Sequence, residues 1–115
     1  MKVVANRSFI VVRPKAPMVK WVNGYNEDKV AERDIYSVRN LYMIENLEEG
    51  TSEEIDKFVK KHYEDIFINQ LWEWYTDENY FPENLSFEMF KEWFEYESIE
   101  MCWDTLKSKV LLEDD

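Results

Sequence analysis

The chain has 115 residues, with 25 acidic and 14 basic side chains and a formal net charge of −11. This length suits one domain, and 45% hydrophobic and 17% aromatic residues supply enough apolar surface for a folded core. Because nucleic-acid and membrane-surface binding draw on cations, we expect neither. One Cys and one His exclude multi-cysteine zinc sites and the two-histidine zinc-protease motif, so no metal or cofactor is predicted.

The charge is unevenly distributed along the chain. Residues 1–44 hold eight basic and four acidic side chains, whereas residues 45–115 hold six basic and 21 acidic ones. The two parts should attract each other within one fold, and the remaining acid must face water or a basic partner. The N-terminal residues show no secretory signal and the one cysteine has no partner, so we expect a cytoplasmic protein.

The first predicted element is a strand over residues 7–13, where β-branched and aromatic residues predominate until Pro14, which cannot donate a ladder hydrogen bond. Pro17 suits the first turn of a following helix. Apolar residues at helical spacing form one face of that helix: Met18, Trp21, Val22 and Tyr25. Gly24 is expected to end the helix in the left-handed conformation.

A polar loop over residues 26–34 and a second strand over residues 35–44 are predicted next. The helical link between the two strands permits a parallel, right-handed crossover. An acidic turn at residues 45–50 then leads to a helix that starts at Thr51. Its apolar stripe keeps helical spacing for some twenty residues, as one helix or as two helices that break near His62.

The last third of the chain is predicted to hold a loop, a short helix, a strand and a tail. The loop covers residues 77–84, and Ser86 caps the short helix, which includes Phe94. Alternating polarity over residues 99–104 indicates a third strand. The expected fold is α+β, a two-layer sandwich of a three- or four-stranded sheet with three to four helices on one face. We assign a single globular domain to residues 1–106 and an acidic C-terminal tail to residues 107–115.

Two segments carry a family resemblance. They are Arg-Pro-Lys-Ala-Pro at residues 13–17 and Phe-Pro-Glu-Asn-Leu-Ser-Phe-Glu-Met-Phe-Lys-Glu-Trp-Phe at residues 81–94. Together with residues 73–78, they resemble a family of small, acidic, uncharacterised bacterial proteins, and the similarity runs to about Leu106. The family has no established activity. The resemblance therefore implies a stand-alone bacterial domain and transfers no catalytic residue.

Three arginines form a candidate anion site. Arg7 and Arg13 have the same side parity on the first strand, and Arg39 would share it if the two strands are neighbours. Arginine binds carboxylates and phosphates through two parallel hydrogen bonds. An internal acid, Glu97 or Glu100, is the alternative partner.

An enzymatic site would draw on the single histidine or the single cysteine. His62 lies near the apolar stripe of the long helix, and Cys102 lies on an alternating strand between Glu100 and Asp104. Acidic neighbours disfavour a reactive thiolate, so Cys102 is expected to be a buried or half-buried small hydrophobe. His62 is expected to pack at the helix surface, and neither residue is assigned a catalytic role.

Aromatic residues provide the main candidate for partner binding. Trp72 does not fit the stripe of the long helix, and Tyr80 and Phe81 lie in the predicted loop beside Asp77 and Glu78. Trp and Tyr dominate binding hot spots because they bury a large area with few rotatable bonds. These five residues would suit a basic protein partner, unless the loop folds back and buries its rings.

Three functions remain open from the sequence. The first is a non-catalytic interaction or inhibitor module for a basic partner, such as a toxin nuclease. The second is a small anion-binding or enzymatic domain that uses Arg7, Arg13 and Arg39 with His62 or Cys102. The third is a structural homodimer that buries Trp72 and its neighbours; the chain is otherwise a monomer.

Overall fold

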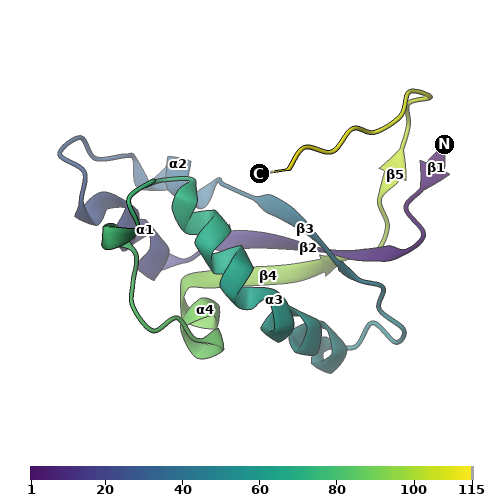
Figure 1. Ribbon diagram of the computed structural model, residues 1–115, viewed down its shortest axis with the longest axis horizontal. Coiled ribbons are helices and arrows are strands. Elements are labelled where there is room, and N and C mark those ends of the chain that lie inside the picture. Colours follow the sequence, from purple (N-terminus) through teal and green to yellow (C-terminus); the bar gives the residue numbers. More distant parts are fainter. Residues whose placement is uncertain (115) are drawn as a thin grey trace.

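The computed structural model describes residues 1–114 and has an α+β fold (Figure 1). Its main sheet has three antiparallel strands in the order β3–β2–β4, so that β2 (Arg7–Pro14) lies between β3 (Asn40–Glu45) and β4 (Phe94–Ile99). The long helix α3 (Ser52–Trp72) crosses one face of this sheet. The sequence prediction of an α+β fold is therefore confirmed.

The remaining helices contribute to one hydrophobic core on the same side as α3. They are α1 (Ala16–Gly24), α2 (Glu32–Tyr36) and α4 (Phe87–Trp93), and a short 3₁₀ helix, η1 (Glu78–Tyr80), follows α3. Alternate residues of β2, Ile10 and Val12, point into this core and are fully buried. The ring of Phe67 on α3 lies at its centre, with edge-to-face contacts to Phe90 and Phe94.

Helix α3 is a single unbroken helix, because its N-terminus is firmly capped and its apolar stripe continues past His62. The Thr51 hydroxyl accepts the Glu54 N–H at 3.2 Å. The Glu54 carboxylate in turn accepts backbone N–H groups of residues 48–50, and these hydrogen bonds hold the pKa of Glu54 below its ordinary value. Gly50 makes this turn possible with a φ of 70°.

A small polar cluster joins α3 to β3 inside the fold. Gln70 is buried, and its side-chain amide donates to Asn40 Oδ1 at 2.9 Å and to the Tyr42 hydroxyl at 2.7 Å. The Tyr42 hydroxyl donates to Asn69 Oδ1 at 2.5 Å. Burial raises the pKa of Tyr42. Asn40, which interrupts the apolar pattern of the strand, therefore satisfies a buried amide.

Several sequence predictions about the first half of the chain are wrong in detail. Residues 32–36 form helix α2 rather than loop and strand, because Glu32 and Asp34 favour a helix start and Ile35 fills the core. The second strand accordingly begins at Asn40. It runs antiparallel to β2, so there is no parallel crossover. Gly24 belongs to α1 and is not left-handed.

The third strand starts earlier than the alternation predicts. Ser86 caps α4 as expected, accepting the Met89 N–H at 3.1 Å, but Phe94 leaves the helix and opens β4 directly. The ring of Phe94 remains in the core, because it faces Pro14 across the ladder. The apolar spacing alone does not show this change from helix to strand.

Beyond the main sheet, the two ends of the domain form a two-stranded ribbon, which we call the arm. Its strands are β1 (Lys2–Val3) and β5 (Trp103–Asp104), and they pair antiparallel. Val3 pairs with Trp103 in the arm, and Phe9 pairs with Ile99 in the main sheet. Six positions separate Val3 from Phe9, whereas only four separate Ile99 from Trp103. This two-residue excess on one strand bends the arm away from the sheet. Residues 105–114 follow the arm without helix or strand.

Candidate functional site

Six aromatic rings gather where α1, the end of α3 and the segment around η1 meet. We call them the aromatic patch: Trp21, Tyr25, Trp72, Tyr75, Tyr80 and Phe81. Tyr75 meets Trp21 edge-to-face at 5.0 Å between ring centroids, and Tyr25 lies 4.7 Å from Tyr80. Trp72 stands at 90° to Phe81 at 5.7 Å. These are favourable geometries for aromatic pairs.

Hydrogen bonds hold the loop of the patch against α1. The Trp21 indole Nε1–H donates to the backbone carbonyl of Tyr80 at 2.9 Å. The Tyr75 hydroxyl donates to the backbone carbonyl of Val22 on the same helix. The Asp77 carboxylate accepts the Asn79 N–H at 3.0 Å and starts η1. The segment is therefore fixed in place rather than loosely attached.

The rings divide into a buried layer and an exposed rim. Trp21 lies in the core, and burial raises the pKa of the Tyr75 hydroxyl. In contrast, 55% of Tyr25 and 41% each of Trp72 and Tyr80 is exposed to solvent. The loop folds back against α1, but of its two rings only Phe81 is half-buried and Tyr80 stays at the surface, as do Tyr25 after α1 and Trp72 at the end of α3.

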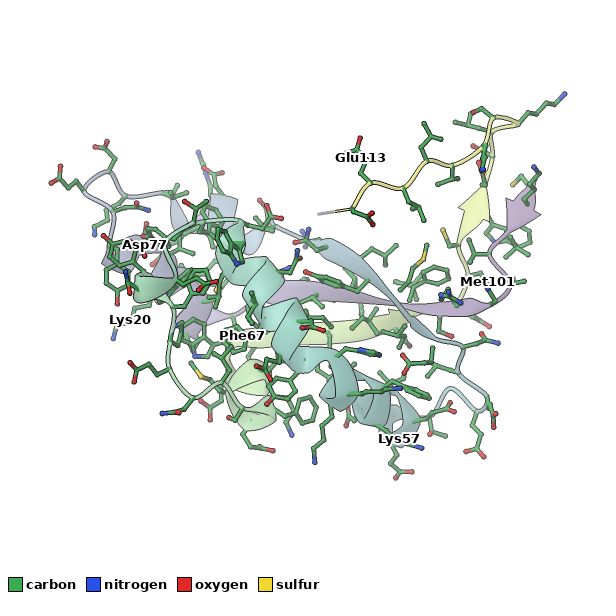
Figure 2. The ribbon with its side chains drawn as sticks, in the orientation of Figure 1. Lys20, Lys57, Phe67, Asp77, Met101 and Glu113 are labelled. Atoms are coloured by element: carbon green, nitrogen blue, oxygen red, sulfur yellow. The ribbon has the colours of Figure 1, made fainter. Side chains whose placement is uncertain are left out.

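Acidic side chains lie beside this rim. Asp77 and Glu78 are exposed, and within residues 1–114 neither forms an ion pair. Lys20 lies at the same end of the molecule as Asp77 (Figure 2). Its ammonium group forms no ion pair with either carboxylate. The rim therefore combines exposed π faces with uncompensated negative charge, a surface suited to a cation.

The structure brings together all five residues that the sequence predicted for partner binding, and it adds Tyr25. The helical spacing assigned Tyr25 to the buried face of α1. It is instead the residue that follows the last turn, where the chain leaves the core. The helical spacing gave no signal for this position, because Tyr25 continues the apolar face in sequence and only the end of α1 at Gly24 separates it from the core.

The three arginines of the candidate anion site do not form one pocket. Arg7 and Arg13 lie at opposite ends of β2, about 20 Å apart at 3.4 Å per residue. Arg13 contacts Glu97 at 2.7 Å and Glu95 at 3.3 Å, so β4 supplies its internal partners. Arg39 precedes β3, and the ladder register places it beside Arg13.

Two surface cavities differ in their charged lining. One of about 510 Å³ lies at the base of the arm and is lined by Arg7, but also by Glu48, Glu49 and Glu100. The other, between α1 and α2, is lined by none of the three arginines. Neither cavity therefore offers an anion the converging cations that its binding requires.

His62 and Cys102 occupy separate environments. His62 Nε2 lies 2.6 Å from Glu45 Oε1, and Lys61 Nζ lies 3.1 Å from the other oxygen of the same carboxylate. Desolvation opposes ionisation of Glu45, but hydrogen bonds from His62, the backbone and Lys61 outweigh it and lower the pKa to about 2. Cys102 is half-buried, and its carbonyl accepts the Val4 N–H at the base of the arm.

Within residues 1–114, no helix has the length and apolarity that crossing a bilayer requires. In the same range, His, Cys, Asp and Glu side chains form no group of three or more that would hold a metal ion. Comparison with protein families, curated proteins and solved structures finds no match to this chain.

Proposed function

We propose that the chain is a non-catalytic interaction module, or an inhibitor, whose aromatic patch and adjoining carboxylates bind a basic protein. The observation that carries this proposal is the rim of three exposed rings, Tyr25, Trp72 and Tyr80, next to the unpaired Asp77 and Glu78. Rings of this kind supply contact area at low conformational cost, and cations bind over their faces.

The rim is preorganised, which favours binding. The buried layer beneath it, with the Trp21 hydrogen bond to the Tyr80 carbonyl, fixes the loop before any partner arrives. Little conformational entropy is then lost on association. The formal charge of −11 attracts a basic partner from a distance and raises the association rate at low salt. A cytoplasmic protein of this kind would keep its single cysteine reduced.

The test is capture of a basic protein on the immobilised chain, followed by affinity measurements with the purified partner. We expect capture to weaken with added salt, with Trp72→Ala, and with the pair Asp77→Lys and Glu78→Lys. The matched control is Glu113→Lys with Asp114→Lys, which makes the same charge change in the exposed tail. Binding that ignores both salt and the patch variants would refute the proposal.

A further inference from the structure

The second face of the main sheet carries apolar side chains, and several of them are exposed to solvent. Residues of β2 alternate, so Phe9 and Val11 point away from the core that holds Ile10 and Val12. Across the ladder, Phe9 lies between Met43 and Ile99. We call this surface the open face: Phe9, Val11, Leu41, Met43 and Ile99.

The open face combines one buried aromatic ring with exposed apolar side chains. Phe9 is only 1% exposed although it does not belong to the main hydrophobic core, and its cross-strand neighbours are Met43 and Ile99. The apolar residues of β3 on this face are more exposed: Leu41, opposite Val11, is 52% exposed and Met43 is 53% exposed. A contiguous apolar surface of this kind marks an interaction site in a folded protein.

Apolar side chains continue from the end of β4 into the arm. Ile99, Met101 and Trp103 recur at every second residue, and Val3 faces Trp103 across the arm. Trp103 is 53% exposed. An isolated two-stranded ribbon is marginally stable in water, so an arm that carries an exposed Trp needs a surface to pack against. The molecule as a whole is extended: the radius of gyration is 15.8 Å, whereas about 13 Å is typical for this length.

The charges around the open face and the arm identify the occupant. Glu95 and Glu97 are already paired with Arg13, whereas Glu100 and Asp104 at the arm form no ion pair in the part of the chain that the structure describes. Within residues 1–114, Arg7 and Arg39 form no ion pair and bond only to backbone carbonyls. The free carboxylates at the arm of one copy therefore match the free arginines beside the open face of another, which makes this surface self-complementary.

We infer that the open face and the arm form an interface between two copies of this chain, in which the arm of each copy lies on the open face of the other. Trp103 and Met101 would pack on Leu41 and Met43 of the second copy, and the acids of the arm would reach its unpaired Arg39. Each copy contributes six exposed apolar side chains: Val3, Leu41, Met43, Ile99, Met101 and Trp103. At roughly 100 Å² for each, two copies would bury about 1,200 Å², the lower end of the range for specific interfaces.

This interface is independent of the proposed function. Figure 2 shows Met101, next to the arm, and Asp77, next to the aromatic patch, at opposite ends of the longest axis of the molecule. It also differs from a homodimer that buries Trp72, because Trp72 belongs to the patch. Each of the two surfaces can therefore be altered while the other is left intact.

The test is sedimentation of the full chain over a range of micromolar to millimolar concentrations. We expect a monomer–dimer equilibrium whose dissociation constant rises about tenfold or more with Trp103→Ala. Met43→Lys and Arg39→Glu should weaken the dimer as well. The matched controls, Trp72→Ala and Arg33→Glu, lie outside the interface and should leave it unchanged. Melting curves of each variant show whether the monomer still folds.

Three results would overturn the inference. The first is a chain that stays monomeric at every concentration. The second is a dimer that Trp72→Ala weakens and Trp103→Ala does not, because that dimer would use the aromatic patch. The third is a monomer that becomes a dimer only when Val110, Leu111 and Leu112 are replaced by Ser. In that case the tail of the same chain would cover the open face.

Discussion

Replacing Phe67 by Ala should cause a large loss of stability. Its ring is fully buried and contacts Phe94 at 5.2 Å, Trp93 at 5.4 Å and Phe90 at 5.9 Å between centroids (Figure 2). Removing such a ring costs the lost transfer free energy and leaves a cavity, together about 3–5 kcal/mol. A domain of this size has a free energy of unfolding of about 5–15 kcal/mol, so the variant would be marginally folded.

A double-mutant cycle separates the geometry of the rings from simple burial. Phe67 and Phe94 meet at 88°, and an edge-to-face pair adds about 0.5–1.5 kcal/mol beyond its buried area. Phe67→Leu and Phe94→Leu should therefore show a coupling energy of that size. The control cycle pairs Phe67→Leu with Tyr25→Leu, whose rings make no contact, and should be additive within about 0.5 kcal/mol.

Urea unfolding followed by tryptophan fluorescence and by circular dichroism measures these free energies. Coincident curves from the two probes would support two-state analysis. The reasoning fails if Phe67→Ala costs less than about 1 kcal/mol, since the ring would then not hold α3 to α4 and β4. It fails equally if the two cycles give the same coupling energy.

Three further predictions concern polar groups. Gln70→Leu leaves the Asn40 carbonyl and the Tyr42 hydroxyl without their shared donor and should cost about 1–3 kcal/mol in urea unfolding, whereas Gln70→Glu should be worse because it buries a charge. The pKa of Glu45 is about 2 in the folded state against an ordinary 4.5, so the ionised carboxylate stabilises the fold above about pH 4.5 and this contribution is lost as the pH falls toward 2. Because solvent partly screens the group, we expect a contribution of about 1 kcal/mol. Glu45→Gln should remove this contribution from the acid-unfolding curve. Burial and the hydrogen bond to Asp56 raise the pKa of Tyr96. Tyr96→Phe should therefore remove a step above pH 10 from the alkaline ultraviolet titration. A curve that is unchanged above pH 10 would contradict the Asp56 contact.

Local sequence chemistry was sufficient for most elements of the fold. Pro14, Thr51 and Ser86 act through their own backbones or hydroxyls, so the strand end and the two helix starts were predictable from single residues. The failures at α2 and β4 have a different cause. Ile35 and Phe94 are fixed by the core they fill, and a short apolar segment is compatible with helix and strand until its neighbours are known.

The candidate sites show the same division. The unusual positions of Trp72 and Tyr80 were visible because they break a periodic pattern, and the structure leaves both rings exposed. The distance between Arg7 and Arg13 already follows from their six-residue spacing on one strand, whereas the place of Arg39 depended on strand register, which no local pattern encodes. The open face was hidden for the same reason, since its residues come from three strands far apart in the sequence.

The two proposed surfaces together constrain how the chain would act. A dimer through the open face would leave an aromatic patch at each far end, because Met101 and Asp77 lie at opposite ends of the molecule. One dimer would then hold two basic partners, or two sites of one partner, and the second contact would form at a high effective concentration. Trp103→Ala should therefore preserve binding of a single-site partner and weaken binding to a surface densely coated with it. Equal binding of the variant and the original chain to that dense surface would show that the patches act singly.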